Sequence, residues 1–427
     1  MYKEFNYTPL LSKINVPIEV DVNAVQNTVN NTLKGLLFED NNIEDDSLKL
    51  KVWKNGEFGI QFDGEIITVE VPLKLWIQKR IGIMGLTYRD QEIEAGITVK
   101  VRSRLQISKS WGLISKSEVV NYQWTQKPTA KIVGLNVPIT YIVDNILKNN
   151  KETLENMVDK SIMSSIPTQD YVRELWETLQ QPIPISTDDY KAWIVIKPNS
   201  ILMKPINGNN GKITTGVNVE CKIDVIVGNS PRNIKIVSLP ECRLNPRIEP
   251  GFELNILANI PYSIIDSVAM ANVGNQPFGE GKHVVYVDQV KTYGQNDNLV
   301  IGLDMHGFVN GNIYLTGVPY LDKEEGTIRL KNIAYKFKTK NLLHSAINFV
   351  IKPILKNKIE KLFEIPMKEN FYLIEQMANS SLMNTELAEN VYTKGEVTRV
   401  EGGEIFISEA GVQAQLNIKG AFHVLYK

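Results

Sequence analysis

Two stretches of this sequence place apolar residues four or eight positions apart over the length of a long helix. This spacing constrains the fold more than any other feature, because side chains four apart share one helix face. The apolar positions are Ile142, Ile146, Leu154, Val158 and Ile162 in the first stretch, and Leu343, Ile347, Ile351, Leu355, Ile359 and Phe363 in the second. Each stretch ends at an isoleucine–proline pair, Ile166-Pro167 or Ile365-Pro366, which predicts a helix break. A second, shorter helical pattern follows each pair.

The two predicted helices stand in matching contexts, which indicates a duplicated unit. Asn15-Val16-Pro17-Ile18 in the first half corresponds to Asn259-Ile260-Pro261-Tyr262 in the second, and a short helical pattern follows each. In the first half we expect that helix to begin after Asp21, a suitable N-cap, and to end near Gly35. The predicted organisation is a first unit over residues 1–228, a junction over 229–250 and a second unit over 251–427.

Between the helices the sequence has the pattern of antiparallel sheet. Residues 97–107 alternate apolar side chains with Lys100, Arg102 and Arg104, which is typical of a strand with one face in the core and one in water. Asn55-Gly56 is a strong hairpin signal. The predicted fold class is therefore α+β, with two tandem units in each of which a curved antiparallel sheet wraps a long amphipathic helix.

Composition excludes some functions and leaves the compartment open. With 47 basic and 48 acidic residues the net charge is −1, so no strong field attracts nucleic acid. The N-terminal residues lack the apolar core of a secretory signal. The chain is therefore either cytoplasmic or begins after a removed signal. Cys221 and Cys242 either form one disulfide or are two buried thiols, and we expect the second.

No residue pattern predicts catalysis, a metal site or a cofactor. The acidic loop at residues 39–46 lacks the glycine of an EF-hand loop, so we expect a solvated turn. His306 lies in an alternating strand and has no partners at the spacing that zinc binding or acid–base catalysis requires. We therefore expect a protein without enzymatic activity.

Two resemblances add to this interpretation. The tandem order of short helix, sheet and long helix resembles the tubular lipid-binding superfamily, which includes bactericidal/permeability-increasing-like proteins. That resemblance implies a seam between helix and sheet that accepts acyl chains. Ile14-Asn15-Val16-Pro17-Ile18, together with residues 35–41, 48–54 and 71–76, is similar to a bacterial family of unknown function carried on envelope lipoproteins. The second resemblance covers the whole chain and implies a setting in the bacterial envelope (periplasm), with no known activity.

Under the lipid hypothesis the long helices line an apolar groove. Burying each methylene group contributes about 0.8 kcal/mol, so an acyl chain binds well in a dry groove. The residues expected to contact a lipid or other hydrophobic small molecule are Ile142, Ile146, Leu154, Val158, Ile347, Ile351 and Leu355. Peripheral contact with a membrane and the identity of protein partners stay open. The alternative is a structural or protein-interaction module of the cell envelope without a ligand, which predicts fully packed units and an exposed sheet edge or apolar patch.

Overall fold

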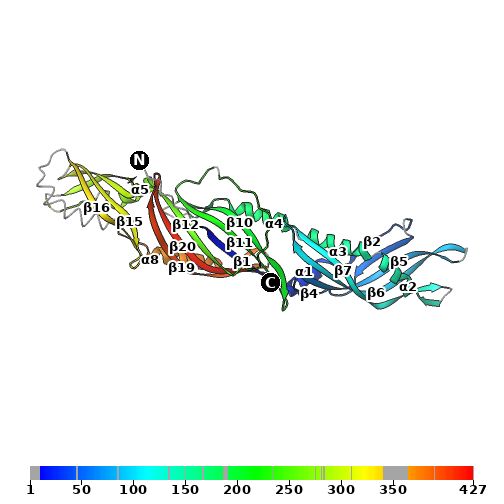
Figure 1. The fold of residues 1–427 in the computed structure, drawn as a ribbon. Coiled ribbons are helices and arrows are strands. Elements are labelled where there is room, and N and C mark those ends of the chain that lie inside the picture. The colour runs from blue at the N-terminus through cyan, green and yellow to red at the C-terminus, as the bar shows by residue number, and fades with distance from the viewer. Residues whose placement is uncertain are drawn as a thin grey trace.

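The computed structural model is an elongated molecule built mostly of β-strands (Figure 1). Three curved, largely antiparallel sheets follow one another along its length, with eight strands in the middle sheet, seven in the sheet at one end and five in the sheet at the other. The structure describes residues 10–44, 47–83, 86–132, 135–149, 151–165, 168–185, 191–232, 234–274, 276–279, 281, 284–308, 310–339, 364–388 and 390–426.

The central sheet combines strands from both halves of the chain. Its strands are β1 (Ser12–Asp21), β9 (Ile183–Pro184), β10 (Ala192–Asn209), β11 (Lys212–Val227), β12 (Gly251–Pro261), β18 (Met383–Ala388), β19 (Val391–Ile407) and β20 (Gly411–Tyr426). Their order in space is β18-β19-β20-β1-β12-β11-β10-β9. Exchanging β1 with β12, β11 with β20, β10 with β19 and β9 with β18 returns the same order read backwards. The sheet therefore has the pseudo-two-fold arrangement of a duplicated unit.

Ser12 joins the two halves near the middle of this sheet. Its side chain is fully buried, and its Oγ accepts a 2.9 Å hydrogen bond from the backbone N–H of Asn255. The same hydroxyl donates to the Asn255 carbonyl oxygen at 3.2 Å. Around it, Lys13, Ile14 and Asn15 pair antiparallel with residues 251–253. The two halves therefore share one continuous sheet.

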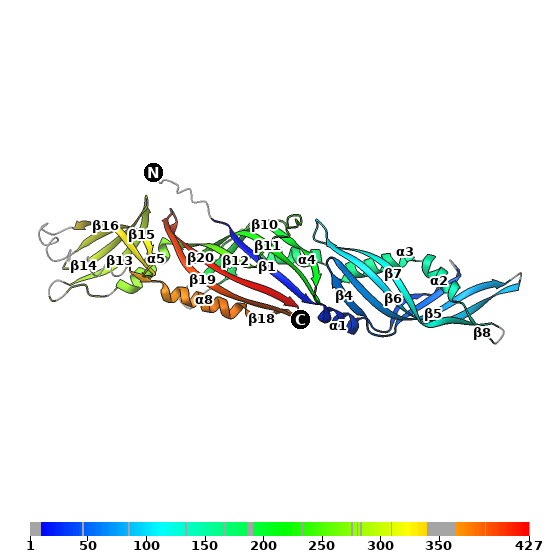
Figure 2. The same ribbon diagram turned by 60° about the horizontal axis from the view of Figure 1, so that its bottom comes forward.

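The seven-stranded sheet belongs wholly to the first half. Its strands are β2 (Leu36–Asp40), β3 (Leu48–Lys54), β4 (Gly59–Asp63), β5 (Ile66–Ile83), β6 (Leu86–Ile107), β7 (Leu113–Ile132) and β8 (Leu135–Pro138). Helix α1 (Val22–Thr32) packs against β4, while α2 (Thr140–Asn149) and α3 (Lys151–Ser165) lie against β7 (Figure 2). Val143 of α2 is fully buried against Ile77, Ile93 and Ile97. This core holds α2 on the sheet.

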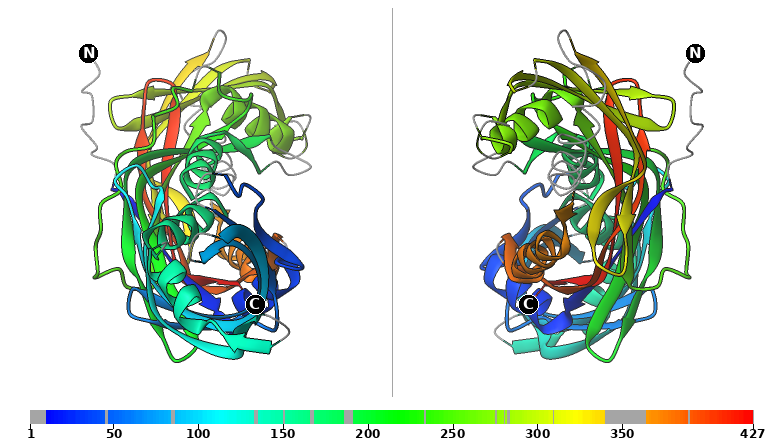
Figure 3. Two further views of the ribbon diagram at one scale, coloured as in Figure 1. Left: turned by 90° about the vertical axis from the view of Figure 1, so that its right-hand side faces the viewer. Right: turned by 90° about the vertical axis from the view of Figure 1, so that its left-hand side faces the viewer.

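The five-stranded sheet belongs to the second half. Its strands are β13 (Val285–Gln295), β14 (Asn298–Gly307), β15 (Gly311–Asp322), β16 (Thr327–Thr339) and β17 (Ile365–Pro366). Helix α5 (Tyr262–Val273) packs its Ile265 and Met270 against a core that includes Ile301 and Ile313. Viewed along the long axis, the strands curve around the helices (Figure 3).

Helices α4 (Thr168–Leu179) and α8 (Lys368–Leu382) both pack on the core of the central sheet. Trp176 of α4 is buried there, and Ile374 and Ala378 of α8 contact the same cluster. The two helices follow the two isoleucine–proline pairs of the sequence. They also precede corresponding strands of the central sheet, which fits the pseudo-two-fold arrangement.

Several predictions about local structure are confirmed. Strand β1 leads into α1, and the Asp21 side chain caps that helix by accepting a 2.7 Å hydrogen bond from the N–H of Asn23. Curved antiparallel sheet is also confirmed, but the chain is mostly β with few helices. The strands are longer than the sequence pattern suggested: β6 runs from Leu86, whereas the alternation that predicts it begins at residue 97. Sheet pairing extends these strands beyond their regular alternation.

The remaining expectations are answered only in part. The first long helical pattern is helical over Thr140–Asn149 (α2) and Lys151–Ser165 (α3), and Asn150 between them lies outside the described residues. The second pattern, at residues 341–363, lies outside the described residues. The predicted boundaries at 228 and 251 coincide with the end of β11 and the start of β12. Since strands from both sides of these boundaries share the central sheet, the division into two units stays a prediction.

Candidate functional site

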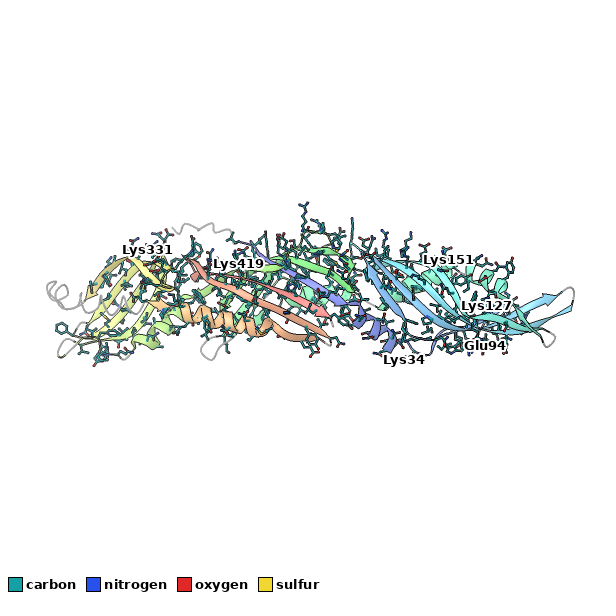
Figure 4. The ribbon with its side chains drawn as sticks, turned by 90° about the horizontal axis from the view of Figure 1, so that it is seen from below. Lys34, Glu94, Lys127, Lys151, Lys331 and Lys419 are labelled. Atoms are coloured by element: carbon teal, nitrogen blue, oxygen red, sulfur yellow. The ribbon has the colours of Figure 1, made fainter. Side chains whose placement is uncertain are left out.

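A cleft of about 220 Å³ opens between helices α2 and α3 and strands β6 and β7. It is lined by Ile97, Val99, Val119, Val120, Asn121, Tyr122, Leu147, Lys148, Lys151 and Leu154. The six aliphatic residues among them make its surface mainly apolar. Figure 4 labels Lys151 at its place beside the seven-stranded sheet.

The apolar surface of the cleft follows from two periodicities. Along β6, alternate residues face the core, and Ile93, Ala95 and Ile97 are at most 1% exposed. Along α2, Val143 and Leu147 lie four apart and join the same core. The cleft forms at the edge of this core, beside Leu147 of α2 and Leu154 of α3.

A β-bulge shapes the wall that β7 contributes. The β6–β7 register passes from Lys100↔Asn121 to Val101↔Val119, so Val120 is an extra residue on β7. A bulge bends its strand and changes the direction of the side chains beside it. Val120 is 45% exposed and lines the cleft. The bulge therefore places an exposed apolar side chain at the opening.

Three carboxylates of α2 and α3 bind β7. The hydroxyl of Tyr122 donates a 2.8 Å hydrogen bond to Asp144 Oδ1, and the backbone N–H of Val119 donates a 2.7 Å bond to Glu155 Oε1. The hydroxyl of Ser115 donates to Asp159 Oδ1 at 2.8 Å. Burial, followed by the hydrogen bond to Asp144, raises the pKa of Tyr122 above its ordinary value of 10.0. These hydrogen bonds hold α2 and α3 to β7 beside the cleft.

Two lysines lie at the opening of the cleft. Lys148 is in the last turn of α2, and Lys151 is the first residue of α3. Lys151 Nζ lies 3.6 Å from Glu155 Oε1, the same oxygen that accepts from Val119. No acidic side chain is among the ten lining residues. The lining therefore combines two lysines with a mainly aliphatic surface, and Glu155 pairs with one of the lysines.

Only some of the residues predicted to contact a ligand lie within the described part of the structure. Leu154 lines the cleft, and Val158 is half-buried on α3 outside the lining. Ile142 and Ile146 lie in α2, but their side chains are outside the described part of the structure. Ile347, Ile351 and Leu355 fall in the undescribed range 340–363. The assignment of these residues as ligand contacts therefore stays a prediction.

Most of the lining was not among the predicted contacts. Leu147 is one residue from Ile146, and its four-residue spacing from Val143 is a signal that the sequence carries. Ile97 and Val99 belong to the strand alternation, but nothing in the sequence places that strand beside α2. The lysines carried no sequence signal, because charged residues on a helix are usually solvated.

The charged groups that the sequence analysis singled out elsewhere form ion pairs. In the acidic loop, Glu39 pairs with Lys51 at 2.6 Å and Glu44 with Arg80 at 3.1 Å. His306 Nδ1 lies 2.7 Å from Asp288 Oδ1 on an exposed strand surface. Within the described ranges, no three His, Cys, Asp or Glu side chains gather as a metal site would require. Cys221 and Cys242 are both buried free thiols.

The fold and the cleft define a mostly β protein with curved antiparallel sheets and a small apolar cleft beside two helices. The chain belongs to the family described as "Domain of unknown function (DUF4403)", which matches residues 10–425. This confirms the resemblance to a family of unknown function, while the envelope setting stays a prediction. No curated protein matches the sequence.

Two solved structures align with this chain over nearly its whole length. A lipopolysaccharide binding protein is 11% identical over 99% of this chain and 100% of its own, with a TM-score of 0.28. P47 of Clostridium botulinum E1 is 10% identical over 96% of this chain and 98% of its own, with a TM-score of 0.24. Across the described residues, no helix has both the length and the apolar character needed to cross a membrane.

Proposed function

We propose that this protein binds a lipid or another hydrophobic molecule in the cleft between α2, α3 and the seven-stranded sheet. The observation that supports this most directly is the lining itself, in which six aliphatic side chains surround a space of about 220 Å³. A ligand chain that enters it removes apolar surface from water on both sides, at about 25 cal/mol per Å². The proposal includes the bacterial-envelope setting that the family resemblance implies, and it does not include an enzymatic activity.

The test is uptake of a neutral fluorescent probe, N-phenyl-1-naphthylamine, which gains fluorescence in apolar surroundings. Replacing Leu154 with tryptophan adds a large side chain to the cleft wall, so we expect uptake to be lost. The matched control is Leu175→Trp, because Leu175 is 69% exposed on α4 and lies outside the cleft. Circular dichroism verifies that both variants fold. Equal probe uptake by Leu154→Trp and the wild type would refute the proposal.

A separate experiment looks for a ligand that co-purifies with the expressed protein. Purified protein is extracted with organic solvent, and the extract is analysed by lipid mass spectrometry. We expect a lipid in a fixed ratio to protein, with less recovered from Leu154→Trp than from Leu175→Trp. An extract without lipid, from protein that also fails to bind the probe, would favour the alternative function.

That alternative is a protein-interaction module, and exposed apolar residues on α4 and α8 favour it. Tyr171 and Leu175 lie four apart on α4 and are 59% and 69% exposed. Leu373 and Met377 lie four apart on α8 and are 55% and 67% exposed. Contiguous exposed apolar residues often mark interaction surfaces. Under this alternative, Leu175→Glu with Met377→Glu abolishes an association seen by sedimentation velocity, and neither the wild type nor the variant takes up the probe.

A further inference from the structure

We propose that the ligand of this cleft is a single-chain anionic amphiphile, whose chain lies among the aliphatic residues and whose head group lies between Lys148 and Lys151. This inference rests on the proposed function, since it names the chemical class bound at the same site. Three features of the cleft support it: its charge, its volume and the distribution of polar groups around its opening.

Lys148 and Lys151 are the two charged residues of the lining, and the nearby carboxylates of Asp144 and Glu155 each already accept a hydrogen bond from β7. Within the described part of the chain, Lys148 has no carboxylate within ion-pair distance, and Lys151 has only Glu155, at 3.6 Å. Glu155 Oε1 also accepts the 2.7 Å hydrogen bond from Val119, so its charge is shared between the strand and the lysine. An anionic group between the two ammonium groups gains attraction from both, and water weakens but does not cancel it.

The volume limits the size of the ligand. Pockets that hold drug-sized molecules have volumes of about 300–1,000 Å³. The cleft measures about 220 Å³, which is below that range. It therefore has room for part of one alkyl chain, and a lipid with two or more chains would leave most of its apolar surface outside.

The polar groups lie where a head group would emerge. Asn121, Lys148 and Lys151 are exposed, whereas Ile97 is buried and Val99, Leu147 and Leu154 are half-buried. A chain that enters from the opening therefore passes from basic and amide side chains to aliphatic ones. This gradient matches an amphiphile with one charged end, and a neutral hydrocarbon would gain nothing from the lysines.

The experiment measures displacement of N-phenyl-1-naphthylamine by four competitors of equal chain length: dodecanoate, dodecyl phosphate, dodecanol and didodecanoyl phosphatidic acid. We expect the two single-chain anions to bind about five- to tenfold more tightly than dodecanol, in keeping with two partly exposed ion pairs. This preference should shrink between 50 and 500 mM NaCl, because salt screens exposed charges. Comparing the two anions distinguishes a carboxylate head group from a phosphate.

The test variant is the double substitution Lys148→Gln with Lys151→Gln, and the control is Lys160→Gln, an exposed lysine on α3 away from the cleft. The double variant should bind dodecanoate no better than dodecanol, whereas Lys160→Gln should keep the wild-type preference for dodecanoate. Equal binding of dodecanoate and dodecanol by the wild type would refute the inference while probe uptake upholds the proposed function. Displacement by the two-chain lipid as strong as by dodecyl phosphate would also refute it. Absence of probe uptake would refute both.

Discussion

The phenol of Tyr122 and the carboxylate of Asp144 form a 2.8 Å hydrogen bond between strand β7 and helix α2. The ring of Tyr122 lines the cleft and contacts Trp124 edge-on, with 5.9 Å between ring centroids. One side chain therefore contributes to the apolar wall and also holds the helix that closes the cleft. The bond therefore fixes α2 beside the cleft together with the core around Val143.

Replacing Tyr122 with phenylalanine tests the bond without removing the ring. We expect the variant to lose about 1–2 kcal/mol of unfolding free energy, because a hydrogen bond to a carboxylate is lost and Asp144 keeps its partial burial. Urea unfolding followed by circular dichroism measures the change. The matched control is Tyr141→Phe, because Tyr141 is 77% exposed on α2. Equal losses in the two variants would contradict the assignment.

The same bond predicts a pH dependence at alkaline pH. The folded-state pKa of Tyr122 is raised above 10.0, chiefly by burial and then by Asp144. A group whose pKa is raised on folding stabilises the protein below its unfolded pKa, and this contribution is lost as the pH rises through the folded pKa. Wild-type stability should therefore fall above pH 10 more steeply than that of Tyr122→Phe. Parallel curves for the two proteins between pH 9 and 11.5 would contradict this origin.

Glu155 fixes α3 to the bulged part of β7 by accepting the Val119 N–H at 2.7 Å. Glu155→Ala leaves this donor without its partner, and we expect a loss of about 1–3 kcal/mol of unfolding free energy. Glu155→Gln should retain much of the stability, because its amide oxygen can accept the same bond. Hydrogen exchange at the Val119 amide should accelerate in the alanine variant alone. Unchanged exchange there, or an equal effect of Lys160→Ala, would show that the bond does not hold the helix.

Local features of the fold could be predicted from sequence because they depend on neighbouring residues. The cap at Asp21 and the alternation along β6 are examples. The face of α2 that contacts the sheet is harder to predict. Ile142 and Ile146 form one series with four-residue spacing in α2, and Val143 and Leu147 form another. Successive helical residues are about 100° apart, so each series defines a face, and only the position of the sheet decides which face it contacts. The structure packs Val143 and Leu147 against the sheet.

The remaining features depend on pairings that the sequence does not encode locally. The bulge at Val120 exists only relative to the register of β6. The central sheet pairs Ser12 with residues more than 200 positions away, on β11 and β12. The repeated order of elements predicts a duplication, but it does not predict that strands from both halves of the chain share one sheet. The lysines of the cleft form a candidate site only because the fold places α2 and α3 on β7.

Gly208 marks the junction between the central sheet and the seven-stranded sheet. It exchanges two backbone hydrogen bonds with Gly64, of 2.9 and 2.6 Å. A Cβ on Gly208 would lie 2.1 Å from Phe62 Cδ1 and 2.8 Å from the Phe62 carbonyl carbon. Gly208→Ala should therefore cost about 1–3 kcal/mol through overpacking, measured by urea unfolding. Gly59→Ala is the control, because its Cβ would meet only Glu70 Cβ at 3.9 Å. A neutral Gly208→Ala would mean that this junction is loosely packed.

Cys221 and Cys242 lie in the core of the central sheet, and their reactivity reports on it. Burial raises the pKa of the Cys221 thiol to about 11 and also raises that of Cys242. At pH 8 only about one Cys221 in a thousand is then a thiolate, the reactive form. Neither thiol should react with Ellman's reagent in the native protein, and both should react in 8 M urea. Cys242→Ala should reduce the urea value from two thiols to one. Rapid native reaction would contradict the burial, and a urea value of zero in the wild type would reveal a disulfide instead of two buried thiols.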